Sequence, residues 1–334
     1  MRKIIILLCL LHLSTTLSMS QNEDLQKPWG VIYNSTGHVY NNDAHSAELV
    51  TQVLLGMPVK ILEQQGNWRK IEMPDSYIGW INGSVEPMTE REYLEYLEKP
   101  KIVVTAHSSS SYSMASPNSQ IVSDLTVGNQ LVLDGKKGKY YRVIYPDGRK
   151  AFVKKSDAEM ESNWLKDIEL TSGSIVETAK QFIGIPYVWG GTSAKGLDCS
   201  GFTKTVYFMH GIIIARDASQ QVNYGRLIDQ SGDFDKLQPG DLVFFGSKAT
   251  VENPKEKVVH VGIALGNKQF IHASDYVKIS SFDPTDPLYD EYNTNRYLRA
   301  KRIIGSVNTS GIEEIYHNTF YRKQENDTKQ TTIH

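Results

Sequence analysis

Three residues of this sequence, one cysteine and two histidines, have the types and surroundings that thiol catalysis requires. Cys199 lies in the stretch GLDCSGF and is one of only two cysteines among 334 residues. His260 and His272 follow downstream in the stretches VVHVGIAL and QFIHASD. A thiolate nucleophile needs a general base, most often histidine, and a third group that orients that base. The three residues could therefore serve as nucleophile, base and orienting group of a cysteine hydrolase.

The residues around Cys199 predict that it opens a helix. From Cys199 to His210 the apolar side chains recur at helical spacing, and Gly211 is suited to end the helix. Asp198 is suited to the N-cap position. The free N–H groups of a first helical turn favour a thiolate, so we expect this position to lower the thiol pKa. An inert buried cysteine is the alternative that local context leaves open.

The two histidines lie in two short predicted strands joined by the three residues GNK at 266–268. In a hairpin with a three-residue loop, paired positions add up to 534. His260 then faces Ser274, and His272 lies on the diagonal of the same sheet face. A two-residue loop without a bulge would place the imidazoles on opposite faces. A single histidine in a strand is more often structural, but two on one face with an upstream cysteine favour catalysis.

An internal repeat precedes this region. Residues 48–81 align without a gap on residues 120–153 at a shift of 72, and Gly56 then meets Gly128. Apolar residues alternate in short runs between turn residues, which predicts that each copy is an all-β barrel of roughly 60 residues. The charged stretch at 89–99 predicts a linker helix. The alternative is a chance match of two unrelated β segments.

The two copies differ at polar positions that the alignment brings together. Glu48 of the first copy corresponds to Gln120 of the second, and Tyr77 corresponds to Arg149. Drift on solvated faces would explain such differences. The sharper hypothesis is that one copy has acquired a function.

The N-terminus has the pattern of a secretory signal peptide. Arg2 and Lys3 precede the apolar run IIILLCLLHL, and small polar residues lead to an expected cleavage after Ser20. An uncleaved membrane anchor is the alternative. Cleavage would remove Cys9 and change the net charge from −2 to −4. We therefore expect secretion across the inner membrane, to the periplasm or beyond, with no stable membrane anchor and no nucleic-acid partner.

The stretches GIPYVWGGTSAKGLDCSGF, LQPGDLVFF, HVGIAL and FIHAS resemble, in order and spacing, the successive motifs of NlpC/P60-type cell-wall cysteine peptidases. That family has a papain-like α+β fold, and the resemblance extends from near residue 165 to near residue 305. It implies six site residues: Cys199 as nucleophile, His260 as base, His272 as orienting residue, Tyr187 as oxyanion donor beside the Cys199 N–H, and Trp189 and Asp198 in the pocket.

The two β copies resemble bacterial SH3-like domains. Two such domains before an NlpC-type domain resemble the γ-D-glutamyl-L-diamino-acid endopeptidases of murein peptide recycling, of the dipeptidyl-peptidase VI type. Those enzymes cut between D-Glu and the diamino acid, usually meso-diaminopimelate, and several require a free N-terminal L-Ala. In that group the first SH3-like domain supplies a Glu and a Tyr to the substrate amine. The matching positions here are Glu48 and Tyr77, with Asp198, Ser200 and Ser219 completing the site.

The expected fold class is multidomain, with two small all-β SH3-like barrels followed by an α+β papain-like domain. The expected organisation is a signal peptide (1–20), a first SH3-like domain (28–88), a linker helix (89–99), a second SH3-like domain (100–160), a peptidase domain (165–305) and a loosely ordered polar tail (306–334). We expect a monomer that needs no metal or cofactor, since the mature chain would keep one cysteine and no ligand spacing among its histidines.

Other functions remain compatible with these motifs. The chain could be a wall-binding module with an inactive peptidase domain, although intact Cys199, His260 and His272 argue against this. It could also be a general murein endopeptidase whose SH3-like domains only target the wall. An amidase or acyltransferase on the same fold is the third alternative, because a thioester can pass to an amine instead of water.

Overall fold

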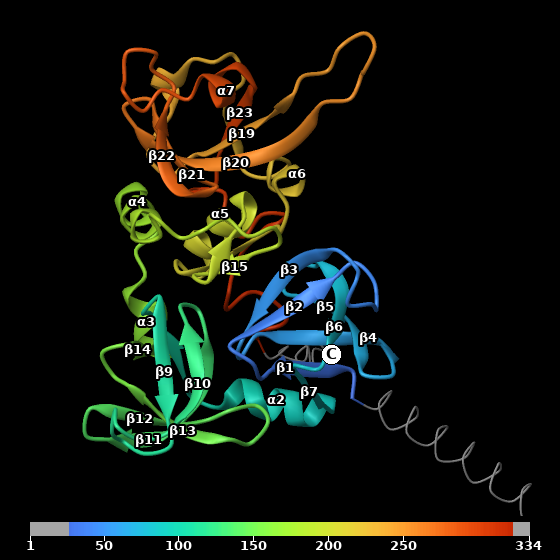
Figure 1. Ribbon diagram of the computed structural model, residues 1–334, viewed down its shortest axis with the longest axis vertical. Coiled ribbons are helices and arrows are strands. Elements are labelled where there is room, and N and C mark those ends of the chain that lie inside the picture. The colour runs from blue at the N-terminus through green and yellow to red at the C-terminus, as the bar shows by residue number, and fades with distance from the viewer. Residues whose placement is uncertain (1–26, 323–334) are drawn as a thin grey trace, which may run out of the picture.

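The computed structural model describes residues 27–322, so the expected signal peptide lies outside the described residues. The chain forms two small β units, here called the first repeat (29–88) and the second repeat (101–160), and a larger C-terminal domain (161–322). The two repeats lie next to each other below the C-terminal domain, and helix α2 (Glu90–Glu98) connects them (Figure 1).

Each repeat forms a seven-stranded antiparallel sheet. The strands of the first repeat are β1 (Trp29–Ile32), β2 (Thr36–Tyr40), β3 (Leu49–Leu54), β4 (Pro58–Gln65), β5 (Trp68–Glu72), β6 (Ile78–Asn82) and β7 (Val85–Met88). Those of the second are β8 (Lys101–Val104), β9 (Ser108–Tyr112), β10 (Ile121–Thr126), β11 (Gln130–Lys137), β12 (Tyr140–Ile144), β13 (Lys150–Lys154) and β14 (Ala158–Met160). The strand orders, β3-β2-β6-β5-β4-β1-β7 and β10-β9-β13-β12-β11-β8-β14, are the same. Strands β8 to β13 begin 72 residues after β1 to β6, so the predicted repeat is confirmed.

Matching positions of the two repeats have matching physical roles. Ile71 and Val143 are both fully buried in the separate cores of their repeats. Gly56 and Gly128 both adopt a left-handed backbone, with φ of 84° and 85°. Only glycine adopts that conformation at little cost, which explains why both copies keep it at this turn.

Helix α2 occupies the stretch for which the sequence predicts a linker helix. Thr89 caps it and forms a capping box with Glu92, whose carboxylate accepts from the Thr89 N–H at 2.8 Å. Tyr93 and Tyr96 form its buried face.

The C-terminal domain packs helices against one main sheet. Its helices are α3 (Glu161–Asp167), α4 (Ser172–Gln181), α5 (Cys199–Phe208), α6 (Ala218–Gln221), α7 (Glu291–Asn295) and the 3-10 helix η1 (Phe234–Lys236). Its strands are β15 (Thr192–Ser193), β16 (Gly196–Leu197), β17 (Ile212–Ile214), β18 (Arg226–Asp229), β19 (Leu242–Ser247), β20 (Lys257–Gly266), β21 (Gln269–Ser274), β22 (Tyr276–Ser281), β23 (Tyr297–Arg302) and β24 (Ile312–Glu314). Six of them form the sheet β18-β23-β19-β20-β21-β22. Phe202 and Val206 of α5 share one core with Val261 and Ile271 of the sheet, so α5 is held against β20 and β21.

The two repeats contact each other directly. Leu55 O accepts from the Gln130 N–H at 2.8 Å, and the Asn129 side chain donates to Ser35 O at 2.8 Å. Arg149, the counterpart of Tyr77, donates through Nη2 to Tyr33 O at 2.9 Å. One of the polar differences between the copies therefore holds the two repeats together.

The first repeat also contacts the C-terminal domain. The Gln52 side-chain oxygen accepts from the Thr192 N–H and from Ser193 Oγ, each at 3.1 Å. Lys204 of α5 pairs with Asp75, whose side chain is almost completely buried. Strand β3 and the loop before β6 are therefore held against the end of the C-terminal domain that carries Cys199.

The polar tail expected from residue 306 is not loose in its described part. Strand β24 pairs with β17, and Ile312 and Ile315 are buried. The red C-terminal segment returns to the first repeat (Figure 1). The prediction is wrong for 306–322, because apolar residues among the polar ones anchor the segment; residues 323–334 lie outside the described residues.

Between residues 27 and 322 no helix combines the length and the apolar character needed to cross a bilayer.

The turn at Gly56 gives a test of the contact between the repeats. A Cβ at Gly56 would lie 2.3 Å from Gln130 O, whereas a Cβ at Gly66, also left-handed at φ 59°, would have no atom within 4 Å. We expect Gly56→Ala to lower the free energy of unfolding by roughly 2–4 kcal/mol and Gly66→Ala by about 1 kcal/mol. Urea unfolding of both variants measures this. Equal losses would contradict the close contact at Gly56.

Candidate active site

Cys199 is the first residue of α5, as the sequence predicts, and it is 8% exposed. Asp198 caps the helix, because its Oδ1 accepts from the Gly201 N–H at 2.6 Å. The backbone N–H groups of Ser200 and Val261 are directed at the sulfur. The sulfur therefore lies between the start of α5 and strand β20.

The expected lowering of the thiol pKa is wrong for the free protein. Burial raises the pKa of the Cys199 thiol to about 11, and the Asp198 carboxylate acts in the same direction. The Val261 N–H of β20, the Arg216 guanidinium and the Ser200 N–H at the helix start stabilise the thiolate, but they do not outweigh desolvation. The thiol is therefore protonated at neutral pH and needs a base to become nucleophilic.

The two histidines lie on one face of the β20–β21 hairpin. Ile263 pairs with Ile271 and Ala264 with Phe270, so the predicted register in which paired positions add up to 534 is confirmed. The predicted three-residue loop is wrong, because Gly266 pairs with Gln269, and a bulge after Ala264 keeps the register. His260 Nε2 lies 2.8 Å from His272 Nδ1. This contact leaves Nδ1 of His260 as the ring nitrogen available for a substrate or a thiol.

Two residues beyond the predicted three extend this histidine pair. His272 Nε2 lies 3.1 Å from Ser280 Oγ and 3.9 Å from Asp290 Oδ2. Burial lowers the pKa of His272 to about 4, although Asp290 opposes the shift. Burial, followed by the neighbouring His272, lowers the pKa of His260 well below its usual range. Both imidazoles are therefore neutral at pH 7.

Tyr187 lies beside Cys199. Its N–H donates to Asp275 O at 2.8 Å, which ties the loop before Cys199 to the turn between β21 and β22. Burial, and then the nearby Cys199 and Asp198, raise the pKa of Tyr187 above its usual value. Its phenol keeps its proton and can donate a hydrogen bond to a developing oxyanion.

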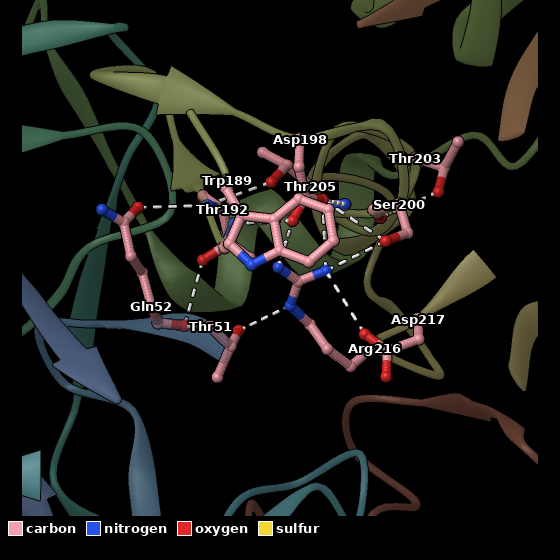
Figure 2. A network of polar contacts seen from close by, with 12 residues as sticks. Thr51, Gln52, Trp189, Thr192, Asp198, Ser200, Thr203, Thr205, Arg216 and Asp217 are labelled. Carbon is pink, nitrogen blue, oxygen red and sulfur yellow. Dashed lines mark hydrogen bonds and ion pairs between the residues drawn. The ribbon is translucent and has the colours of Figure 1, made fainter. Parts of the chain in front are cut away.

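Arg216, which the sequence analysis did not single out, is the centre of a buried polar network (Figure 2). The Arg216 side chain is 1% exposed, and its Nη2 donates to Asp198 Oδ2 at 2.5 Å. Its Nη1 donates to Ser200 Oγ at 3.0 Å, and its Nε donates to Thr51 Oγ1 of the first repeat at 2.7 Å. The same guanidinium thus binds the N-cap residue of α5 and strand β3.

This network changes the expected roles of Asp198 and Ser200. The Asp198 carboxylate also accepts from the Gly190 N–H at 3.0 Å, so both of its oxygens are occupied by groups of the protein. Asp198 therefore does not offer a free carboxylate to a substrate ammonium. The Ser200 hydroxyl contacts Arg216 and Asp198 in the same way.

Tyr77 meets a carboxylate that the sequence analysis missed. The Tyr77 hydroxyl lies near the side chain of Asp217, and burial followed by the Asp217 charge raises the pKa of Tyr77 to about 12. Burial raises the pKa of Asp217, and Arg216, 3.9 Å away, compensates only in part. Asp217 follows the apolar strand β17 and opens α6, and a carboxylate at such a junction is the signal that could have drawn attention to it.

Glu48 of the first repeat contacts Trp189 of the C-terminal domain. Trp189 Nε1 donates to Glu48 Oε1 at 3.0 Å, and this contact lies at the exposed surface. Ser219 is exposed on α6 two residues after Asp217. The structure thus brings Glu48 to Trp189 and Tyr77 to Asp217.

No three side chains of His, Cys, Asp or Glu within residues 27–322 gather in a way that could hold a metal ion. The chemistry available to the described site is that of a thiol, two imidazoles, a phenol and carboxylates.

Comparison with known proteins shows which family has this combination of domains. Residues 184–302 match the NlpC/P60 family, and residues 39–84 match the bacterial dipeptidyl-peptidase Sh3 domain. A "Gamma-D-glutamyl-L-lysine dipeptidyl-peptidase" of Bacillus cereus is 31% identical over 262 residues, which cover 75% of this chain and 76% of that protein. The chain belongs to the NlpC/P60 family. A Bacillus subtilis protein of the same name is 30% identical over 254 residues, 72% of this chain and 78% of that protein.

A solved NlpC/P60 family protein from Bacillus cereus has the same fold with a TM-score of 0.69 and 26% identity. The match covers 82% of this chain and 99% of that chain. An N-terminal all-β SH3-like region followed by an α+β NlpC/P60 domain is thus the architecture of this protein. The match to the dipeptidyl-peptidase Sh3 domain falls on the first repeat, which supplies Glu48 and Tyr77.

The buried histidine pair predicts loss of stability in acid. Because the pKa of His272 falls to about 4 in the folded protein, the unfolded chain binds the proton more readily below pH 6.5. The contribution of the neutral, buried His272 to the free energy of unfolding is therefore fully present above about pH 6.5. It falls by on the order of 2–3 kcal/mol as the pH drops toward 4. His272→Gln should reduce this loss, while His38→Gln at an exposed position should not. Denaturant unfolding between pH 4 and 7 measures it, and identical pH profiles for the wild type and His272→Gln would contradict the assignment.

Proposed function

We propose that this protein is a peptidase that cleaves the γ-D-glutamyl–diamino acid bond of short murein peptides with a free N-terminal L-Ala. Membership of the NlpC/P60 family already makes it a cysteine peptidase. The observation that carries the finer proposal is the meeting of the first repeat with the nucleophile region: Tyr77 contacts Asp217, and Glu48 contacts Trp189.

In the proposed reaction, Cys199 is the nucleophile and His260 the base. Nδ1 of His260 takes the thiol proton, and the sulfur attacks the side-chain carbonyl carbon of D-Glu. The Cys199 N–H and the protonated Tyr187 phenol stabilise the oxyanion. His260 then gives the proton to the leaving amine of the diamino acid, and water hydrolyses the thioester with His260 as base.

The surroundings of His272 support its role as the orienting residue. When His260 carries a second proton, its Nε2–H can donate to His272 Nδ1, and the His272 Nε2–H can donate toward Ser280 and Asp290. The charge that forms on His260 is thereby stabilised by a carboxylate two contacts away. Burial keeps both rings neutral in the free protein, so this stabilisation is needed only during reaction.

Asp217, in place of Asp198, is the proposed carboxylate for the substrate ammonium. A half-buried carboxylate with a raised pKa gains from a cation, because the ammonium replaces the water that Asp217 has lost. Glu48 and Tyr77 complete this site, with Trp189 at its edge. Only L-Ala and D-Glu precede the cleaved bond, so the ammonium must bind close to Cys199. A sugar-linked stem peptide lacks this ammonium and would leave the Asp217 charge compensated only in part, by Arg216 at 3.9 Å.

The diamino acid and the location of the protein belong to the proposal as well. The names of the Bacillus relatives specify L-lysine, whereas the motif resemblance suggests meso-diaminopimelate, so both peptides should be tested. The N-terminal pattern supports export to the periplasm or beyond.

Product analysis tests the proposed function. The purified protein is incubated with L-Ala-γ-D-Glu-meso-diaminopimelate and with L-Ala-γ-D-Glu-L-Lys, and products are identified by mass spectrometry. We expect L-Ala-D-Glu and the free diamino acid. A peptide transferred to an added amine would favour the acyltransferase alternative, and cleavage of intact sacculi at a comparable rate would favour a general murein endopeptidase.

Substitutions at the three proposed catalytic residues should reduce turnover to different extents. Cys199→Ala should reduce turnover by more than about a thousandfold, since it removes the covalent nucleophile. His260→Ala should be almost as severe, and His272→Gln less so, because an amide can still orient His260 in part. Steady-state kinetics with either tripeptide measures this, with circular dichroism as the control for folding. A His272→Gln variant as active as the wild type would refute the orienting role.

The amine site is tested by combining substitutions with N-acetylation of the peptide. Asp217→Asn should cost on the order of 2–4 kcal/mol in kcat/KM for the free peptide, and Glu48→Gln, at the exposed edge of the site, about 1 kcal/mol. Both losses should largely disappear for the acetylated peptide, which has no ammonium. Glu63→Gln, an exposed change in the same repeat, should have no effect on either peptide. If the wild type cleaves free and acetylated peptides equally, no ammonium site exists.

A further inference from the structure

The segment after β24 links the C-terminal domain back to the first repeat. We call residues 315–322 the C-terminal strap. Ile315 is buried in the C-terminal domain, and its N–H donates to Gly211 O at 2.8 Å. The chain then crosses to the first repeat, where Phe320 packs edge-on against Trp29 with ring centres 5.6 Å apart. The strap is thus held at both ends by different parts of the protein.

Asn318 is the polar centre of the strap. Its side chain is 3% exposed. Its Nδ2 donates to Pro74 O of the first repeat at 2.9 Å and to Glu313 Oε2 at 2.7 Å. Its Oδ1 accepts from the Phe320 N–H at 3.0 Å. The Nδ2 group therefore joins the strap to the first repeat, and Oδ1 fixes the conformation of the strap itself.

Pro74 begins the tight turn that presents Tyr77. The Met73 N–H donates to Tyr77 O at 2.9 Å, and the Ser76 N–H donates to Met73 O at 2.8 Å. Ser76 has a left-handed backbone with φ of 61°, a conformation that costs free energy for a residue other than glycine. Such a turn needs support from its surroundings to stay in one conformation.

Two contacts support this turn from outside the first repeat. On one side Asp75 pairs with Lys204 of the nucleophile helix α5. On the other side Pro74 O accepts from Asn318. Beyond the turn, the Tyr93 hydroxyl donates to Phe320 O, and Trp29 stacks on Tyr93 with ring centres 4.2 Å apart. The strap thus fixes the turn relative to Asp217.

We infer that Asn318 is a positioning residue for the amine site: it holds the Pro74–Tyr77 turn so that Tyr77 meets Asp217, and the preference for a free N-terminal amine depends on it. This inference rests on the proposed function. Asn318 is distant in sequence from the nucleophile and touches none of the groups proposed to react. Its loss should therefore weaken recognition of the ammonium more than it slows the chemical step.

The experiment compares Asn318→Asp with Asn308→Asp. Both side chains donate to a glutamate of the same segment, Asn318 to Glu313 and Asn308 to Glu314, each at 2.7 Å, but only Asn318 also donates to the first repeat. The readout is the ratio of kcat/KM for the free tripeptide to that for its N-acetylated form. Asn318→Asp should lower this ratio about tenfold, mainly through KM of the free peptide, since the carboxylate cannot donate to Pro74 O or to Glu313 and the turn loses its contact with the strap. Asn308→Asp should leave the ratio unchanged.

The outcomes separate a positioning role from a structural one and from failure of the proposed function. A general loss of folding would lower kcat/KM for both peptides and leave the ratio intact; an unchanged ratio in Asn318→Asp, or an equal fall in Asn308→Asp, overturns the inference. A wild type that does not discriminate between the peptides overturns the proposed amine site itself. If Asn318→Asp does not yield folded protein, Tyr93→Phe decides: removal of its bond to Phe320 O should lower the ratio, and an unchanged ratio overturns the inference.

Discussion

The site depends on one buried guanidinium. Arg216 binds both oxygens of Asp198, at 2.5 and 3.2 Å, and also binds Thr51 of the first repeat. Removing one partner of a buried ion pair leaves an uncompensated charge and typically costs about 3–5 kcal/mol. Because Asp198 caps the helix that begins with Cys199, the start of that helix and the first repeat are fixed by the same side chain. The contact between the first repeat and Arg216 thus helps to hold the surroundings of Cys199 in place.

The two repeats make different contacts. The same scaffold occurs twice, but the first copy presents Tyr77 to Asp217, while its counterpart Arg149 in the second copy binds Tyr33 of the first. One copy therefore faces the site, and the other supports it. The burial of Cys199 also explains the protonated thiol: exclusion of water raises the pKa of Cys199 more than the neighbouring N–H groups and Arg216 lower it.

The features that follow from local periodicity could be predicted from the sequence. The gapless repeat, the Asp198 cap and the hairpin register of His260 and His272 all depend on spacing along one stretch of chain. What the sequence did not reveal lies where distant segments meet. Asp198 looked free for a substrate because Arg216 joins it only through the fold. The C-terminal segment looked loose because the partner of Asn318 lies 244 positions away in the sequence. The pKa of the thiol depends on burial, which no single segment determines.

The central claim is that the first repeat and the C-terminal domain together bind the amino terminus of a short peptide beside Cys199. The most direct measurement is a crystal structure of the Cys199→Ala variant with intact L-Ala-γ-D-Glu-meso-diaminopimelate. The account predicts the ammonium next to Asp217 and Tyr77, with the γ-carbonyl at the start of α5. A peptide bound to the C-terminal domain alone, with its amino terminus in solvent and away from the first repeat, would contradict it.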